Sequence, residues 1–160
     1  MATMTFHERF NKILEILLVA IMTILVLDVL WQVFSRYVLS SPSSFTDELA
    51  GYLLIWVSLL GAAYVTGRKE HLAIDIMLRK QKPERQRKIM LAIESIILLF
   101  AATVMVAGGI WLMYTRFVLE VKSAALQLPL GYVYIVLPLS GLIICYYSIY
   151  HIVELKNKKY

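Results

Sequence analysis

The chain is poor in charge and in the residues that build most catalytic sites. Only 17% of its 160 residues are charged, and it contains a single cysteine, Cys145. A single cysteine excludes an intramolecular disulfide, and Cys145 has no nearby acid–base partner that would make it a catalytic thiol. Hydrophobic residues make up 60% of the chain, which is outside the usual range for a soluble domain. These proportions argue against a water-soluble fold.

The sequence also lacks the motifs of metal, cofactor and nucleotide sites. Its three histidines, His7, His71 and His151, fall at or outside the expected membrane interfaces, so the paired intramembrane ligands of a haem are absent. No Cys/His cluster has metal-ligand spacing, and neither a glycine-rich phosphate loop nor a nucleophile elbow occurs. We therefore expect no catalytic residue, no metal and no cofactor, and we do not expect an enzyme.

Four long apolar runs occupy most of the chain, at residues 13–38, 49–66, 89–113 and 133–153. Each is close to the roughly 20 apolar residues that cross a hydrocarbon core of ~30 Å. The runs are continuous, whereas the strands of a membrane β-barrel alternate in hydrophobicity. The first run is too long for a signal peptide, and no small-residue cleavage site follows it. The sequence predicts an all-α membrane protein, with four transmembrane helices in one membrane domain over residues 1–160.

Basic residues gather in only some of the segments between the runs. The segment 67–88 is densely basic and both termini add further lysine or arginine, whereas residues 39–48 contain none. Because short basic segments resist translocation, we expect both termini and the segment 67–88 to be cytoplasmic. This distribution explains the net charge of +5 by topology and anionic lipids, so a nucleic-acid partner is not expected.

The basic segment contains two further helix signals. Residues 71–80 mix apolar and basic side chains, as a short amphipathic helix lying at the interface would, and Asp75 and Arg79 would pair on it. Pro83 and Glu84 then resemble the start of the third helix, because proline and an acid are both favourable in a first turn.

A polar seam, formed by Asp28, Gln32 and Arg36, follows one face of the first helix at a spacing of four residues. Each charge near the bilayer centre costs roughly 2.5–3.5 kcal/mol, so these groups should face protein. One interpretation is an ion or proton relay, and the other is a structural ladder that joins helices or a partner subunit. We favour the structural one, because the helix is apolar from below Asp28 down to Glu15 and a relay would stop halfway.

Other polar and small residues predict contacts between helices. Asp47 and Glu48 open the second helix, where the helix dipole favours acids and where Arg36 is a plausible partner. Glu15 and Glu94 fall near the cytoplasmic helix ends, and we expect them to pair with interfacial lysine and arginine side chains. The patterns Ser58-xxx-Ala62, Ala63-xxx-Gly67 and Thr103-xxx-Ala107 allow close helix packing. Pro138 should weaken or kink the fourth helix.

Taken in order, these residues resemble the small membrane subunit, or Q subunit, of tripartite ATP-independent periplasmic (TRAP) transporters. The likeness covers nearly the whole chain, with Phe45 at a position where the family usually has Trp. It is carried by Arg36-Tyr37, Asp47-Glu48-Leu49-Ala50, Trp56, Gly61-Ala62, His71-x-x-Ile74-Asp75, Ser123-Ala124-Ala125-Leu126-Gln127-Leu128-Pro129 and Pro138.

The resemblance implies a complex with a large multi-helix membrane subunit and a periplasmic solute-binding protein in the bacterial inner membrane. Such complexes use a sodium gradient to take up organic-acid anions, for example sialic acid or C4-dicarboxylates. The small subunit would be a non-catalytic scaffold for the static part of an elevator-type transporter, in contact with its partner directly or through lipid. The residues expected to hold the bundle or contact a partner are Asp28, Gln32, Arg36, Asp47, Glu48, Trp56, Ser58, Gly61, Ala62, Glu94, Pro129 and Pro138.

Two other classes of function remain open from the sequence. A stand-alone, proton-coupled multidrug exporter would act as a homo-oligomer and use Asp28 or Glu94 as its coupling acid. An intramembrane enzyme or redox subunit would carry a bound chromophore in its redox form. The residues that recognise a transported solute are expected in other chains, so the sequence leaves the solute open.

Overall fold

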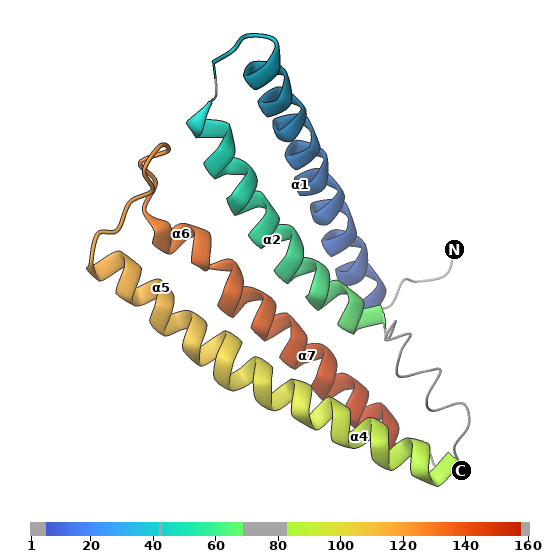
Figure 1. The fold of residues 1–160 in the computed structure, drawn as a ribbon. Helices are drawn as coiled ribbons and strands as arrows, with labels where there is room; N and C mark the ends of the chain where they lie inside the picture. Colours follow the sequence, from blue (N-terminus) through green and yellow to red (C-terminus); the bar gives the residue numbers. More distant parts are fainter. Residues whose placement is uncertain (1–5, 42, 69–82, 158–160) are drawn as a thin grey trace.

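A computed structural model describes residues 6–41, 43–68 and 83–157, and nearly all of them are helical. The first hairpin consists of α1 (Phe6–Tyr37) and α2 (Ser44–Arg68). In the second hairpin, α4 (Pro83–Phe100), the π-helix η1 (Ala101–Gly108) and α5 (Gly109–Val118) follow one another without a break. They run antiparallel to α6 (Leu130–Tyr134) and α7 (Val136–Asn157), which one residue separates (Figure 1).

The two hairpins lie side by side, with α2 packed on α7 (Figure 1). The helix order across the molecule is therefore α1, α2, α7 and then the rod formed by α4, η1 and α5. The start of α1 and the end of α7 lie at one end of this bundle, which we call the terminus end. The turn between α1 and α2 and the connection 119–129 form the opposite end, which we call the loop end.

Four helices within the described residues are long and apolar enough to cross a membrane, which confirms the predicted fold class. They cover Glu8–Tyr37, Ser44–Arg68, Arg85–Val118 and Leu130–Asn157. All four are longer than the apolar runs, because a run marks only the part suited to hydrocarbon whereas the helix continues into the polar interface. The third helix begins at Pro83, as predicted. The expected interfacial helix 71–80, with its Asp75–Arg79 pair, lies outside the described residues.

The core lies where α2 and α7 meet. Leu60 and Ala63 of α2 and Val136 and Tyr147 of α7 are completely buried. Half of the most apolar stretch of the fourth span is buried, against 11% for the first span. α7 is thus the central helix, while α1 packs chiefly on α2 and leaves most of its apolar surface exposed. Lipid or another membrane chain can cover such surface without a hydrophobic penalty.

Glycine and the π-helix bring the third span close to α7. Buried Ala101, Met105 and Gly109 recur every four residues, as the wider winding of a π-helix allows. A Cβ added to Gly109 would lie 2.9 Å from Cδ of Pro138, and one added to Gly141 would lie 2.8 Å from Cβ of Met105. Larger residues at these two glycines would force the helices apart.

The fourth span loses regular helical hydrogen bonding near Pro138, although Ile135, between α6 and α7, keeps helical angles of φ −55° and ψ −33°. Helix α6 ends at Tyr134 and α7 starts at Val136. Proline has no N–H, and its ring clashes with the carbonyl four residues earlier, which here belongs to Tyr134. The helical hydrogen bonds resume when the Leu139 N–H donates to the Ile135 carbonyl at 3.2 Å. The predicted weak point is therefore present, one turn before the proline.

Candidate functional site

The Glu48 carboxylate organises the loop end of the bundle. Its Oε1 accepts the backbone N–H of Ala124 at 2.8 Å, and its Oε2 accepts those of Ala125 and Leu126 at 3.1 and 2.9 Å. Hydrogen bonds to an ionised acceptor are roughly twice as strong as neutral ones. We call this arrangement the Glu48 clamp, because it fixes the connection 119–129 to the first turn of α2.

The connection itself is a narrow hairpin that presents its amides to this carboxylate. Lys122 and Pro129 form an antiparallel bridge, and the Ser123 N–H donates to the Leu128 carbonyl at 2.9 Å. Glu120 and Gln127 adopt positive φ angles of 48° and 54° at its two bends. Pro129 directly precedes α6, so the hairpin also sets where the fourth span begins.

The polar seam joins α1 to α2. Gln32 Nε2 donates to Asp28 Oδ2 at 3.4 Å and to the Thr46 carbonyl in the first turn of α2 at 2.7 Å. Asp28 is only 9% exposed, and Ser35, whose hydroxyl donates to the Gln32 carbonyl at 3.0 Å, is also buried. Asp28 and Gln32 therefore face protein, as a structural ladder requires, whereas Arg36 at the top of the seam is exposed.

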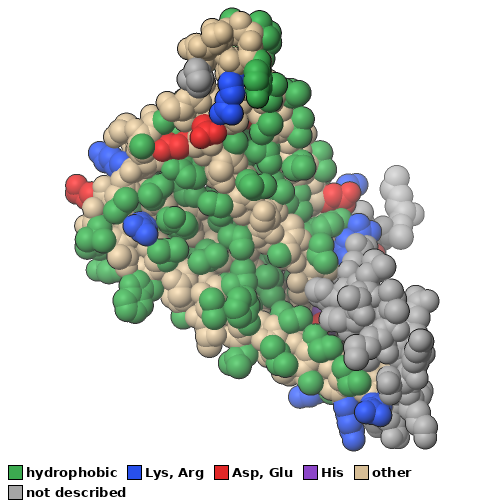
Figure 2. All heavy atoms as spheres, in the orientation of Figure 1, with side chains coloured by type: hydrophobic (Ala, Val, Ile, Leu, Met, Phe, Trp, Pro, Cys, Tyr) green, Lys and Arg blue, Asp and Glu red, His purple; other side chains and the backbone are tan. Residues whose placement is uncertain are grey.

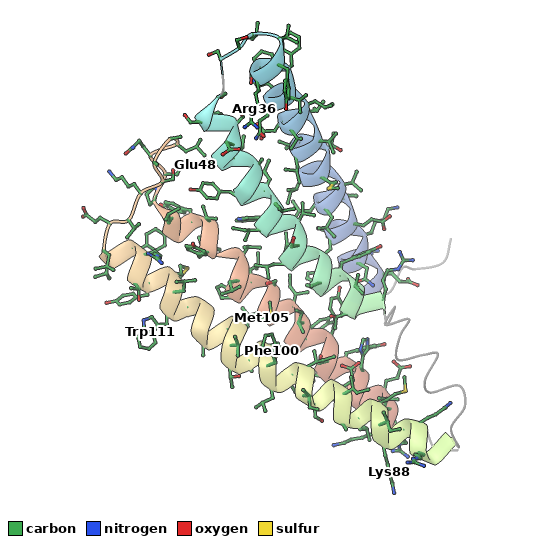
Figure 3. All side chains as sticks on the ribbon, viewed as in Figure 1. Arg36, Glu48, Lys88, Phe100, Met105 and Trp111 are labelled. Carbon is green, nitrogen blue, oxygen red and sulfur yellow. The ribbon has the colours of Figure 1, made fainter. Side chains whose placement is uncertain are left out.

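Arg36 does not form the pair with Glu48 that the sequence suggested. Both residues lie at the loop end (Figure 3), but no ion pair joins these two described residues, and both Glu48 oxygens accept backbone amides of the connection 119–129. Three fixed amides need little ordering, whereas a long arginine side chain loses conformational entropy when it pairs at a surface. Asp47, the neighbour of Glu48, is exposed.

Trp56 supplies a second link from α2 to the other hairpin. Its indole Nε1 donates to the Val133 carbonyl in α6 at 3.1 Å. The family resemblance named Trp56 among the residues expected to hold the bundle or contact a partner, without saying what it contacts. In the structure it ties the short helix α6 to the middle of the bundle.

At the terminus end, Glu94 of α4 pairs with His151 of α7. Glu94 Oε1 lies 3.1 Å from His151 Nδ1, and His151 is 2% exposed. The sequence suggested interfacial lysine and arginine partners for Glu94, so the structure gives it a different partner. Glu15 accepts a hydrogen bond from the Tyr64 hydroxyl at 3.4 Å. Hydropathy shows how deep a residue lies but not which side of the helix it occupies, so it could not reveal the histidine.

Two of the three small-residue patterns, Ser58-xxx-Ala62 and Thr103-xxx-Ala107, are exposed within the described part of the chain. Ala63 and Gly67 pack inward, and a Cβ added to Gly67 would fall 2.5 Å from the Tyr147 ring. In contrast, Ser58 and Ala62 are exposed, and a Cβ added to Gly61 would meet nothing within 4 Å. We call Ser58, Gly61 and Ala62 the open α2 face.

An apolar groove of about 650 Å³ continues this face between α2 and the third span. Its walls include Leu59 and Val65 of α2 and Ile96 and Phe100 of α4, and Ile144 of α7 also lines it. Figure 2 shows one broad apolar surface with charged side chains gathered towards the two ends. Trp111, labelled in Figure 3, points away from the bundle and is 73% exposed. The uncovered surface suits lipid or another membrane chain.

The described residues offer no site for metal chemistry. Within them, no group of three or more His, Cys, Asp and Glu side chains is placed to hold an ion. The strongest polar contacts join one part of the chain to another. These contacts can hold the four helices in fixed positions, so that the bundle presents a constant surface to its surroundings.

Comparison with known proteins agrees with the arrangement of these residues. Residues 25–157 match the family described as tripartite ATP-independent periplasmic transporters, DctQ component. A putative TRAP transporter small permease protein of Haemophilus influenzae is 29% identical over 136 residues, which are 84% of this chain and 81% of the relative. The sialic acid TRAP transporter small permease protein SiaQ of Vibrio cholerae is 28% identical over 102 residues, 64% of this chain and 59% of that protein.

The matched region includes the Glu48 clamp, the seam and all of the second hairpin. Family membership makes the chain a permease subunit. The four spans and the family match together make this a multi-pass protein of the bacterial inner membrane, and the chain belongs to the DctQ family of TRAP transporter small permease subunits.

Proposed function

We propose that this small permease subunit is the static scaffold of a sodium-driven importer of organic-acid anions. A large elevator-type membrane subunit would carry the solute and sodium sites, and a periplasmic binding protein would deliver the solute. Two observations together carry the proposal. Side-chain contacts join the helices at both ends of the bundle, through Glu48 and through Glu94, whereas many large apolar side chains on its surface are exposed. A scaffold needs both features.

The internal bracing supports a static role. Glu48 joins α2 to the connection 119–129, Gln32 joins α1 to α2, and Glu94 joins α4 to α7. These contacts involve every long helix of the described chain. An elevator mechanism needs one part that stays fixed while another moves, and contacts that join all the long helices to one another suit the fixed part.

The same contacts count against a stand-alone exporter. Its coupling acid must exchange protons with water, but Asp28 is 9% exposed and hydrogen-bonded to Gln32. The Glu94 side chain is 12% exposed and contacts His151. Water would have to enter the bundle before either acid could couple transport to a proton gradient.

The uncovered surface supports a membrane partner. We propose that the open α2 face and the apolar groove beside it contact the large subunit, because small exposed residues let a second helix approach closely. With both termini in the cytoplasm, the loop end would face the periplasm. Residues 39–48 and 114–132, shaped by the Glu48 clamp, would then be available to the binding protein.

The name of the Vibrio cholerae relative states sialic acid for that protein. For this chain we propose an organic-acid anion of the same broad class, with sialic acids and C4-dicarboxylates as the first solutes to test. The chain itself would not distinguish them, since the solute site would belong to the large subunit.

The test is co-purification of a tagged copy from its native membrane in mild detergent, followed by mass spectrometry of the retained proteins. A large multi-helix membrane protein in near-equal amount is the expected result. The recovered complex, reconstituted in liposomes with its binding protein, should take up the anion only with an inward sodium gradient. Recovery of this chain alone as a homo-oligomer with proton-driven activity would overturn the proposal in favour of the exporter.

A further inference from the structure

A second groove, of about 590 Å³, lies between the terminus ends of α1 and α2. The part nearer the terminus end is lined by polar residues, namely Glu8, Asn11, Lys12 and Glu15 of α1 and Tyr64 and Arg68 of α2. The part nearer the middle of the bundle is lined by Ile16, Val19 and Ala20 of α1. None of these residues belongs to the Glu48 clamp, the polar seam or the open α2 face. We call this cavity the terminus-end groove.

Hydrogen bonds connect the two walls of this groove. Arg68 Nη1 donates to the Tyr64 hydroxyl at 2.7 Å, and that hydroxyl donates to Glu15 Oε2 at 3.4 Å. The Arg68 guanidinium also lies 5.5 Å from the centre of the Tyr64 ring. Glu15 of α1 is thus held opposite Arg68 of α2, and the groove has a defined polar wall.

Lys12 lies almost one turn before Glu15 on α1 and is exposed. Within the described part of the chain, its ammonium forms no ion pair. The groove therefore displays two cations, Lys12 and Arg68, beside two carboxylates, Glu8 and Glu15. The charges of these four side chains sum to zero, but positive and negative groups lie side by side at the rim. Such a rim suits a ligand that is itself zwitterionic.

The groove also has a depth profile. The first membrane span begins at Glu8 and the second ends at Arg68, so the polar rim lies at the level where headgroups meet water. From Glu8 to Ala20, at ~1.5 Å per residue, α1 passes roughly 18 Å towards the hydrocarbon core. The lining changes over this length from charged to aliphatic. An amphiphile with a charged head and an apolar tail matches this change.

We propose that the terminus-end groove binds a zwitterionic phospholipid whose headgroup ends in a primary ammonium. Its phosphate would lie against Lys12 and Arg68, its ammonium would donate to Glu15, and one acyl chain would follow Ile16 and Val19. A purely anionic headgroup would place its negative charge near two carboxylates and would bring no positive charge to offset the repulsion. A choline headgroup has no N–H, so it cannot donate a hydrogen bond to Glu15.

The experiment measures lipid retention by the purified full chain, so it needs no partner subunit and its failure would leave the scaffold proposal intact. The chain is delipidated, and phosphatidylethanolamine, phosphatidylglycerol and phosphatidylcholine with identical acyl chains are added at equal concentration. Native mass spectrometry then counts the adducts of each. Retention of phosphatidylethanolamine should exceed that of the other two about fivefold or more, as expected for one well-placed ion pair.

Two variants and two controls locate the site. Lys12→Gln should lower retention of all three lipids that share the phosphate, and Glu15→Gln should abolish the preference for phosphatidylethanolamine. Lys122→Gln and Glu120→Gln remove an exposed base and an exposed acid at the loop end, and they should leave retention unchanged. Each variant is first shown to have the helical content of the parent chain.

A second readout protects the test against a variant that folds poorly. Phosphatidylethanolamine should raise the Tm of the parent chain more than phosphatidylcholine does, and the difference should vanish in Glu15→Gln. Equal retention of the three lipids by the parent chain would overturn the proposal. A preference for phosphatidylethanolamine that persists in both Lys12→Gln and Glu15→Gln would also overturn it. The same holds if the parent chain retains none of the three lipids.

Discussion

The carboxylate of Glu48 and the backbone amide of Leu126 lie 2.9 Å apart, although 78 residues separate them in the sequence. With the amides of Ala124 and Ala125 they form a contact between the two hairpins at the loop end. Two segments that the sequence presents as separate motifs are therefore one structural unit. This contact holds the start of α2 and the start of the fourth span in a fixed relation.

Replacing Glu48 tests the clamp. Glu48→Ala removes the acceptor of three amides, whereas Glu48→Gln keeps one oxygen acceptor but loses the charge. We expect Tm of the purified chain to fall in the order parent, Gln, Ala, and amide exchange of residues 124–126 to accelerate in the same order. Asp47→Asn is the matched control, since its exposed carboxyl is the adjacent acid, and it should behave as the parent. Unchanged exchange in Glu48→Ala would show that the clamp does not hold the connection.

Arg36 tests the absence of an ion pair with Glu48. In the isolated chain, charge reversal at Arg36 should leave stability nearly unchanged, and reversal at both positions should not restore what reversal at Glu48 loses. A double-mutant cycle measures this coupling, which we expect within about 0.3–0.5 kcal/mol of zero. Recovery of stability in the doubly reversed chain would establish the pair after all. An effect of Arg36→Glu seen only in the complex would assign the arginine to a partner contact.

Gly67 tests the packing of α2 on α7. Because a Cβ at this position would fall 2.5 Å from the Tyr147 ring, Gly67→Ala should lower the free energy of unfolding by about 1–3 kcal/mol. Gly61→Ala is the control in the same helix, where a Cβ meets nothing within 4 Å. Denaturation of both variants in the same detergent gives the comparison. Equal stability of the two variants would mean that the aromatic ring moves aside at little cost.

The buried pair of Glu94 and His151 makes a different prediction. Removing one partner leaves a polar group buried without its contact, so Glu94→Leu and His151→Phe should each lower the free energy of unfolding by about 1–3 kcal/mol. The double replacement should be less harmful than the sum of the two, because two apolar side chains then pack together. Glu120→Gln, at an exposed acid of the loop end, is the control. Additive losses would show that the pair is not coupled.

Different parts of this structure were predictable to different degrees. The four spans follow from the length of the apolar runs, and the Asp28–Gln32 contact follows from a spacing of one helical turn. The partners of Glu48 could not be predicted, because they are backbone amides, which every residue except proline provides. Hydropathy gives depth but not rotation, so it missed His151 as the partner of Glu94. The π-helix has no distinctive apolar pattern of its own.

The open α2 face offers the most direct test of the scaffold proposal. Nothing in the described chain covers Ser58 or Ala62, so replacing both with leucine should leave the Tm of the isolated chain unchanged. If a helix of the large subunit packs closely on this face, two larger side chains should hold it away and lower the amount that co-purifies. Ala63→Leu is the control, and it should lower the stability of the isolated chain. Ala63 is completely buried, so overpacking there should destabilise the chain itself by about 1–3 kcal/mol. Normal recovery of the large subunit with the doubly substituted chain would place its contact on another surface, of which the exposed face of α1 is the largest apolar candidate.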